Sequence, residues 1–486
     1  MCHRCLIIRH IKHFKNIRSC CFSQWLIVYK DLNGIFVFSG QFEHSNSINK
    51  QCYRRHLQHW VCHYNKNAVF LSRRIRLISV HSRSVFFFKT TFRTFVHSLS
   101  EDELFLTPLS PLSALHRHWE TPACSTDVQP PGDSTAFDFS VLSYNILSQE
   151  LLQDNAYLYR HCHPAVLPWS HRLPNLLAEI RQHDADILCL QEVQEDHYQD
   201  QIQPALQALG YQCEYKKRTG RKPDGCAVIF KSSRLSLLSS TPVEFFRPGD
   251  ALLDRDNVGL VVLLRPNDAA ARSDPSARVC VANTHLLYNP RRGDIKLAQL
   301  AILLAEIGRL SRLPDGSSGP VVLCGDFNST PRSPLYSFLT TGRLDYRGLQ
   351  IGSVSGQENS PRGQRLLTSP LWSHSLGIDS QCLYVKKSAV SPCGSLKLQS
   401  SYQHHLPPDG RPEITTCHSH TAMTVDYILY TPEFIAPPSP PCGRGLSLLG
   451  RLSLVGQPEL EEVNGLPNRH HSSDHLPLLA RFRLRR

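Results

Sequence analysis

"VVLCGDFNST", residues 321–330, passes from four apolar residues into Gly325 and then into Asp326, Phe327 and Asn328. The apolar part has the composition of a strand buried on both faces. A carboxylate and an amide at its end need a physical reason, because a buried charge is costly unless it is paired or coordinates a cation. Ends of strands are also where folds carry their functional residues. The stretch therefore predicts a central strand with a site at its end.

Polar residues of the same kind stand at the ends of the other apolar segments. Each alone has an ordinary explanation as a turn residue, a solvated loop or a helix cap. Together they indicate one site, in which converging carboxylates require a cation to offset their repulsion. The donors are mostly oxygens and include no thiolate, which favours Mg²⁺ or Mn²⁺ over zinc. The residues are Asn145, Glu192, Asn283, His285, Asp326, Asn328, Asp426, Asp474 and His475.

From Phe137 onward, strand-like and helix-like segments alternate, which predicts an α/β (α+β) sandwich of mixed sheets. Periodicity and end signals predict helices over 172–183, 196–210, 295–310 and 333–342. Strands are predicted over 137–147, 185–193, 213–219, 225–231, 258–264, 278–287, 320–327, 425–430, 448–455 and 476–484.

The positive charge of the chain is concentrated at its beginning. Residues 1–100 hold 16 Lys and Arg against Asp31 and Glu43, whereas the remainder holds 37 basic and 39 acidic residues. The main part therefore has no global electrostatic attraction to nucleic acid. We interpret 1–100 as a basic, Cys/His-rich and poorly ordered leader, 101–136 as a Pro/Ser-rich linker, and 137–486 as the catalytic domain.

Cysteine usage and hydropathy predict an intracellular protein in the cytoplasm or nucleus. The 17 Cys are scattered along the chain, often inside apolar runs, which is typical of reduced thiols. No apolar run approaches the roughly 18 residues that span a bilayer. The alternative location is the mitochondrion, because the first 30 residues contain no acid and six Lys or Arg.

Six blocks carry a resemblance to a known family. "SYNIL", "LQEV", "NTHL", "GDFNS", "VDYI" and "SSDHLPL" resemble, in order, the signature blocks of the endonuclease/exonuclease/phosphatase superfamily. Finer features such as "QEVQEDHY", "YNPRRGDIKLAQ" and "VNGLPN" resemble the Angel branch of its Ccr4-like family. The resemblance covers 137–486 and implies a four-layer αββα sandwich, with two mixed β-sheets face to face and helices outside.

The same resemblance implies the metal ligands. Glu192 corresponds to the principal Mg²⁺ ligand of the family. Asn145 and Asp474 would complete the site, directly or through water.

Catalytic roles are implied in the same way. Asp326 would orient or deprotonate the attacking water, and Asn328 would hold water and a phosphate oxygen. His475, held by Asp426, would contact the phosphate and stabilise the charge that develops there. His285 would bind phosphate or assist the leaving group.

Basic residues beside the predicted catalytic strands suggest where RNA lies. A run of basic residues is usually a solvated face, and the alternative here is a track for the phosphates of an RNA end. The candidate substrate-binding residues are Asn283, Lys217, Arg218, Arg221, Arg291, Arg292 and Lys296.

Three functions remain open. Deadenylases of the family carry an aromatic residue shortly before the Asp of "DYI", where it stacks on adenine, but "SHTAMTVDY" offers His420 and Thr421. This favours a Mg²⁺-dependent phosphatase that converts a terminal 2′,3′-cyclic phosphate of RNA to free hydroxyls. The alternatives are a 3′–5′ poly(A) exoribonuclease and a non-catalytic RNA-end binder or mRNA-complex subunit. The expected partners are RNA 3′ ends of tRNA or mRNA, and proteins of mRNA metabolism.

Overall fold

The computed structural model comprises two units, Met1–Ser110 and Pro111–Arg486. The first is described only as the strands β1 (Phe22–Asp31), β2 (Gly34–Glu43), β3 (Ile75–His81), β4 (Ser84–Thr90) and β5 (Arg93–Phe95). In the second, the described residues are 115–122, 136–274, 276–342, 344, 348–358, 365–367, 396–419, 421–433 and 445–485.

In the first unit, β1, β2 and β5 form one antiparallel sheet and β3 pairs with β4. The sequence shows no clear strand period there. Runs of β-branched and aromatic residues such as "WLIVY" and "VFFF" nevertheless have high strand propensity. The extents of leader, linker and catalytic domain stay predictions.

Two mixed sheets form the centre of the second unit. In each, one neighbouring pair is parallel, β7 with β8 and β13 with β14, and the other pairs are antiparallel. The first sheet runs β6 (Trp119–Glu120), β19 (Leu446–Leu452), β20 (Leu478–Arg485), β7 (Ala136–Asn145), β8 (Ile187–Gln194), β10 (Asp224–Lys231), β9 (Tyr211–Lys217). The second runs β11 (Leu235–Glu244), β12 (Val258–Pro266), β13 (Val279–His285), β14 (Val321–Asp326), β18 (Asp426–Tyr430), β15 (Gln399–Ser400).

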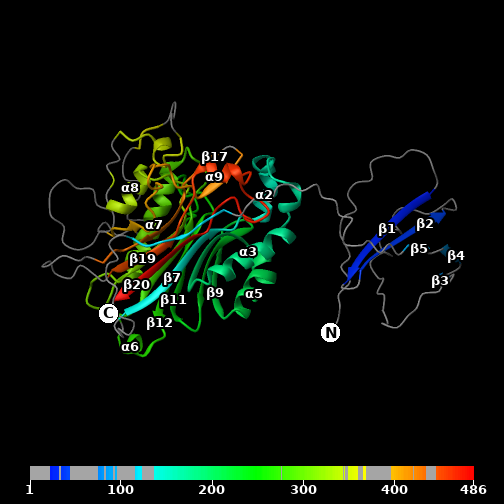
Figure 1. Cartoon of the computed structure of the whole chain (residues 1–486), viewed down its shortest axis with the longest axis horizontal. Helices are drawn as coiled ribbons and strands as arrows, with labels where there is room; N and C mark the ends of the chain where they lie inside the picture. Colours follow the sequence, from blue (N-terminus) through cyan, green and yellow to red (C-terminus); the bar gives the residue numbers. More distant parts are fainter. Residues whose placement is uncertain are drawn as a thin grey trace. The chain divides into compact units, whose positions relative to one another are not determined.

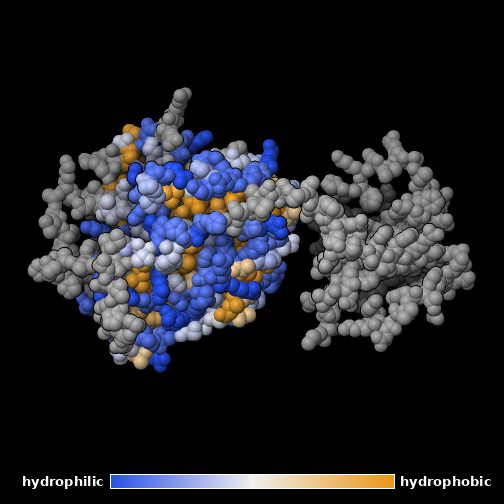
Figure 2. All heavy atoms as spheres, viewed as in Figure 1, coloured by the Kyte–Doolittle hydropathy of each residue, from blue (hydrophilic) through white to orange (hydrophobic). Residues whose placement is uncertain are grey.

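The sheets pack face to face with helices outside, which confirms the predicted αββα sandwich (Figure 1). The inner core joins Val141 and Cys189 of one sheet to Val262 and Cys324 of the other. The outer face of the first sheet is covered by α3 (Trp169–His183) and α5 (Gln203–Ala208). The outer face of the second is covered by α7 (Gly293–Ser311) and α8 (Pro334–Thr341). The visible surface of this unit is mostly hydrophilic, with scattered apolar patches (Figure 2).

Strand register brings the polar strand ends together. In the second sheet His285 pairs with Asp326, and Asp326 pairs with Asp426. In the first sheet Asn145 at the end of β7 pairs with Gln191, next to Glu192. Residues 321–330 are therefore β14 and the turn that follows it, and the polar residues of this segment lie at the edge of the inner core.

Some elements differ from the predictions. The predicted helix 196–210 is α4 (Glu195–His197), a π-helical turn Tyr198–Ile202 and α5, and it begins at Glu195, with Gln194 as its N-cap. β11 was not predicted, because "LSLLSSTPVE" is too polar to show a strand pattern. β6 pairs with β19 although it falls inside the predicted linker. The remaining short elements are α2 (Gln149–Asp154), α6 (Ala269–Ser273), α9 (Gln457–Glu462), β16 (Thr416–His418) and β17 (Thr421–Met423), with 3₁₀ turns at Ala156–Tyr159, Pro164–Val166 and Ile351–Ser353.

Among the described residues, none of the helices combines the length and apolar composition that crossing a membrane requires. The compartment in which the protein works stays a prediction.

Candidate active site

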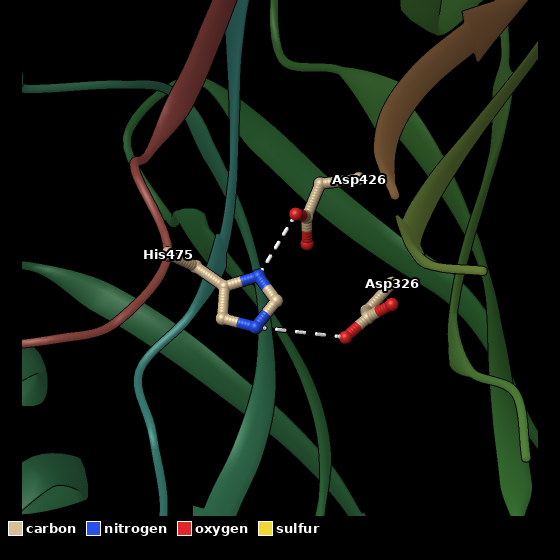
Figure 3. A group of neighbouring side chains, drawn as sticks. All are labelled: Asp326, Asp426 and His475. Carbon is tan, nitrogen blue, oxygen red and sulfur yellow. Dashed lines mark hydrogen bonds and ion pairs between the residues drawn. The ribbon is translucent and has the colours of Figure 1, made fainter. Parts of the chain in front are cut away.

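The centre of the site is the side chain of His475, which lies between two carboxylates (Figure 3). Its Nδ1 is 2.8 Å from Asp426 Oδ2, and its Nε2 is 3.8 Å from Asp326 Oδ2. All three residues are buried. Asp426 is itself held by Thr415, whose hydroxyl donates to Oδ2 at 2.6 Å. Because Nδ1 donates to Asp426, the ring is fixed with Nε2 directed toward Asp326.

Electrostatics favour the protonated form of His475. Burial alone would lower the pKa of its imidazole, but the fields of Asp426, Asp474 and Asp326 and the hydrogen bond to Asp426 outweigh burial. The pKa of His475 consequently lies well above its ordinary value. An imidazolium at this position provides positive charge for a phosphate oxygen.

Glu192 and Asn145 link the first sheet to the second. Glu192 Oε2 accepts from the Ser148 amide at 3.0 Å, and Oε1 accepts from Asn145 Nδ2 at 3.1 Å. The same Nδ2 lies 3.2 Å from Asp326 Oδ2. Asn145 Oδ1 accepts from the Leu147 amide at 3.1 Å. The side-chain amide of Asn145 therefore serves as a donor that connects carboxylates of both sheets.

The backbone of Glu192 is in the left-handed region, with φ of +54°. L-residues seldom adopt this region, and such strain concentrates at functional sites. Burial raises the pKa of the Glu192 carboxyl, and the field of His285 acts against this rise. A carboxylate held here is stabilised by positive charge nearby.

The donor set fits a divalent cation. Asp474 Oδ2 accepts from the Tyr159 hydroxyl at 2.9 Å, but Asp474 Oδ1 is buried and has no hydrogen-bond partner among the described residues. Asp474 Oδ1 also forms a long ion pair with His475 Nε2 at 3.9 Å, and a buried carboxylate oxygen that receives no hydrogen bond is a natural metal ligand. Ligand atoms of Asp326, Asp426 and His475 also lie within 4.8 Å of one another. This set is less suited to a cation, because the Asp426–His475 hydrogen bond already occupies two of its groups.

Asn328 and His285 complete the group of predicted catalytic residues. Asn328, with φ of +46°, donates from its backbone amide to Asp326 Oδ1 at 2.9 Å. Its Nδ2 lies 3.1 Å from His285 Nε2. His285 Nε2 is 3.5 Å from Asp326 Oδ2, and its Nδ1 is 3.9 Å from Glu192 Oε1. The structure thus brings all the predicted metal and catalytic residues together, while their roles stay proposals.

Gly325 explains why this strand end can lie so close to β13. With φ of +146°, a Cβ there would meet the Thr284 carbonyl oxygen at 2.0 Å. Any side chain would push β14 away from β13 and separate Asp326 from His285.

Asn283 does not support its predicted substrate-binding role. It is fully buried, and Nδ2 donates to the carbonyls of Leu190 at 2.8 Å and Ala227 at 2.9 Å. Its Oδ1 accepts from Gln191 Nε2 at 2.7 Å. These hydrogen bonds join the two sheets. The Asn283 side chain lies deeper between the sheets than the residues at the strand ends do.

Lys296 is also placed differently from its prediction as a phosphate contact. It is fully buried in the first turn of α7, and Nζ donates to the Asn328 carbonyl at 2.6 Å and to Gln357 Oε1 at 2.6 Å. Lys296 therefore supports the turn that carries Asn328. Burial lowers the pKa of its amine to about 7.

This buried amine predicts a pH-dependent stability. The pKa falls from 10.5 in the free amine to about 7 in the fold, so the unfolded chain binds more protons between those values. The free energy of unfolding should rise with pH across this window by about 1.4 kcal/mol per pH unit, relative to Lys296→Met. Urea unfolding of both proteins at about pH 7.5 and about pH 9.5 measures the difference. Parallel pH curves for the two proteins would show that Lys296 is not desolvated as described.

The other predicted substrate contacts range from exposed to mostly buried. Lys217 pairs with Glu195 at 3.0 Å, Arg218 with Asp224, and Arg292 with Asp294 at 2.9 Å. Arg221 and Arg291 are exposed. The Lys217–Glu195 pair is exposed enough to exchange for phosphate, whereas the carboxylates that hold Arg218 and Arg292 are buried. A phosphate track along these residues stays a prediction.

Sequence reasoning missed Arg172, which is fully buried. Its guanidinium donates to the carbonyls of Ile146 and Leu147 at 2.5 Å each, and to the Ser472 carbonyl at 2.6 Å. It thereby fastens the loop after Asn145 to the loop before Asp474. In the sequence, Arg172 is a single Arg at the start of the apolar helix pattern 172–183. Its carbonyl partners cannot be seen there, so a buried Arg and a solvated Arg at this position have the same appearance.

The chain is similar to known proteins over most of its length. The sequence model of the Endonuclease/Exonuclease/phosphatase family matches residues 142–475. Protein angel homolog 2 of Danio rerio is 58% identical over 405 residues, which cover 77% of this chain and 70% of that protein. Protein angel homolog 2 of Homo sapiens is 56% identical over 381 residues, covering 72% and 70%.

A solved structure is similar over nearly its full length. It is a crystal structure of ANGEL2, described as a 2′,3′-cyclic phosphatase, in complex with adenosine-2′,3′-vanadate. The TM-score is 0.66 and the identity 56%, over 76% of this chain and 99% of that one.

Proposed function

The chain belongs to the endonuclease/exonuclease/phosphatase family, and we propose that it hydrolyses the terminal 2′,3′-cyclic phosphate of RNA to free 2′- and 3′-hydroxyls. The proposed cofactor is Mg²⁺, with Mn²⁺ as an alternative, and the partners are RNA 3′ ends of tRNA or mRNA. The observation that carries this proposal is the convergence of Glu192, Asp326 and His475, which come from both sheets, around the amide of Asn145.

The residues of the site divide the work of hydrolysis. Glu192 and Asp474 would hold the divalent cation, with Asn145 beside them. When bound, that ion supplies positive charge to the phosphate oxygens and a position for water. Asp326 accepts the proton of the attacking water, while protonated His475 stabilises the negative charge on phosphate.

Complete conversion to hydroxyls requires two hydrolytic steps. In the first, water attacks phosphorus and one ester bond of the ring breaks, so that its oxygen gains a proton and a phosphomonoester remains. In the second, another water breaks the remaining ester bond and inorganic phosphate leaves. His285, 3.5 Å from Asp326, is placed to assist the departing oxygen. Phosphate contacts from Arg218, Arg221, Arg291 and Arg292 would orient the RNA end.

A local observation favours the cyclic phosphatase over a poly(A) exonuclease. Residues 421–425, immediately before Asp426, are Thr, Ala, Met, Thr and Val, so this described stretch offers no aromatic ring for adenine. His420 lies outside the described residues. Loss of a stacking surface removes about 1–3 kcal/mol per base.

Three labelled RNAs test the proposal in the presence of Mg²⁺. They have one sequence and end in a 2′,3′-cyclic phosphate, a 3′-phosphate or an A-tail. Loss of the terminal phosphate without shortening supports the cyclic phosphatase. A ladder of shortened A-tails would instead support the exonuclease, and RNA that is bound but unchanged would indicate a non-catalytic binder.

A further inference from the structure

Two tyrosines next to the candidate site expose unusually large aromatic surfaces. Tyr288 is 63% exposed and Tyr157 is 49% exposed. Single exposed apolar side chains are common and need no explanation. These two differ because residues close to each of them in sequence form hydrogen bonds with residues of the candidate site.

Tyr157 lies in the 3₁₀ turn Ala156–Tyr159, which follows β7 and α2. Two residues later, Tyr159 is buried and its hydroxyl donates to Asp474 Oδ2 at 2.9 Å. The intervening Leu158 accepts through its carbonyl from the Ser419 amide at 3.2 Å. The backbone on the C-terminal side of Tyr157 is therefore fixed against the proposed metal ligand Asp474.

Tyr288 follows β13 from the other sheet, three residues after His285. The two residues between them are held in place. The Leu286 carbonyl accepts from Asn328 Nδ2 at 3.1 Å, and the Leu287 amide donates to Gln299 Oε1 at 3.0 Å. The exposed ring thus extends from a rigid support beside Asn328.

Both tyrosines are anchored to the same site by hydrogen bonds of nearby residues, Tyr157 through Tyr159 and Asp474, and Tyr288 through Leu286 and Asn328. Burial raises the pKa of the Tyr288 hydroxyl, and the fields of Tyr157, Asp474 and Asp326 raise it further. The two exposed rings are therefore anchored to one site from its two sides, Tyr157 after β7 of the first sheet and Tyr288 after β13 of the second.

We propose that Tyr157 and Tyr288 form a stacking platform for the nucleobase of the terminal nucleotide, which bears the cyclic phosphate. The inference rests on the proposed function and extends it from the phosphate to the base. Aromatic rings stack on any base, because every base has a π-face, so the platform selects a nucleotide end without reading its sequence. It also supplies the aromatic surface that residues 421–425 do not offer.

Paired substrates test the platform. One RNA ends in adenosine 2′,3′-cyclic phosphate, and the other ends in the same cyclic phosphate on a ribose without a base. We expect Tyr288→Ala and Tyr157→Ala each to raise KM for the first substrate about tenfold, within the range of one stacking contact. The kcat for both substrates and KM for the baseless one should change less than about twofold. Tyr288→Phe and Tyr157→Phe should retain the wild-type KM, because the ring remains.

Leu209→Ala is the matched control. Leu209 is 41% exposed and precedes β9, whose first residue Tyr211 pairs with Lys231 at the end of the sheet opposite Glu192. This variant should behave as wild type on both substrates. Equal losses on the two substrates, or no loss on the base-containing one, would overturn the platform.

Failure of the proposed function gives a different result. Wild-type protein would then turn over neither substrate, and the platform would be judged from affinity alone. Fluorescence anisotropy in EDTA compares the Kd of the two RNAs for wild type and for Tyr288→Ala. A preference for the base that disappears in the variant supports the platform, and equal Kd values in the wild type reject it.

Discussion

Glu192→Gln is expected to lower kcat for the cyclic phosphate by at least about 10³-fold, because it removes one of the two anionic ligands of the proposed metal site. The amide retains an oxygen that can accept from the Ser148 amide, now at 3.0 Å from Oε2, so the fold should be preserved. The affinity for Mg²⁺ should fall at the same time. Initial rates measured as a function of Mg²⁺ concentration report both effects.

Glu195→Gln provides a control from the same segment. Glu195 stands three residues beyond Glu192, and its side chain, 41% exposed, pairs with Lys217. Removing this charge should alter kcat less than about twofold, because exposed ion pairs contribute little. If Glu192→Gln also stayed near wild-type activity, the assignment of Glu192 to the metal would be wrong.

Asp426→Asn is expected to reduce kcat by about 10²- to 10⁴-fold, the range of a positioned acid–base group. Asp426 accepts the hydrogen bond from His475 Nδ1 at 2.8 Å and is the largest source of the raised His475 pKa. The amide would remove this negative charge and favour neutral imidazole. The pKa of His475, followed by NMR in metal-free protein, should fall together with kcat.

Thr415→Val separates the charge of Asp426 from its positioning. The Thr415 hydroxyl donates to Asp426 Oδ2 at 2.6 Å and accepts from the Val425 and Asp426 backbone amides at 3.0 and 3.2 Å, so its loss keeps the charge of Asp426 but weakens its positioning. A hydrogen bond to a charged carboxylate contributes about 1.5–3 kcal/mol, so a decrease of at least about tenfold is expected, smaller than that of Asp426→Asn. Equal losses in Thr415→Val and Asp426→Asn would mean that Asp426 serves only to support the loop.

The sequence was sufficient to predict the sandwich and the polar residues that meet at the strand ends. Apolar runs ending in Asn145, Glu192 and Asp326 predicted strands whose ends converge, and the family resemblance implied two mixed sheets packed face to face. The structure and the comparisons confirm both the family and the four layers. Convergence could be predicted because a charged group at the end of a buried strand has few stable alternatives.

Depth within the fold could not be predicted. Alternation along a strand correctly places Asn283 on the same face as His285, but two residues correspond to about 7 Å along β13. That distance separates the site from the inner core, where Asn283 bonds to Leu190 and Ala227. Lys296 was misplaced for a related reason. The sequence of the first turn of a helix does not reveal whether that turn packs beneath a loop or faces solvent.

Residues that act through backbone carbonyls were missed altogether. Arg172 binds Ile146, Leu147 and Ser472 through main-chain oxygens, which leave no mark in the side chains at those positions. Tyr159 and its bond to Asp474 join segments more than 300 residues apart, as the separation of 315 shows. Only the three-dimensional arrangement connects them.

We propose above all that side chains distant in sequence hold a divalent cation beside Asp326 and His475. Anomalous diffraction from crystals soaked in Mn²⁺ tests it most directly. We expect a peak within bonding distance, about 2 Å, of the carboxylate oxygens of Glu192 and Asp474, and we expect Glu192→Gln crystals treated in the same way to lose it. A peak remote from Glu192, or one that persists unchanged in Glu192→Gln, would contradict the account.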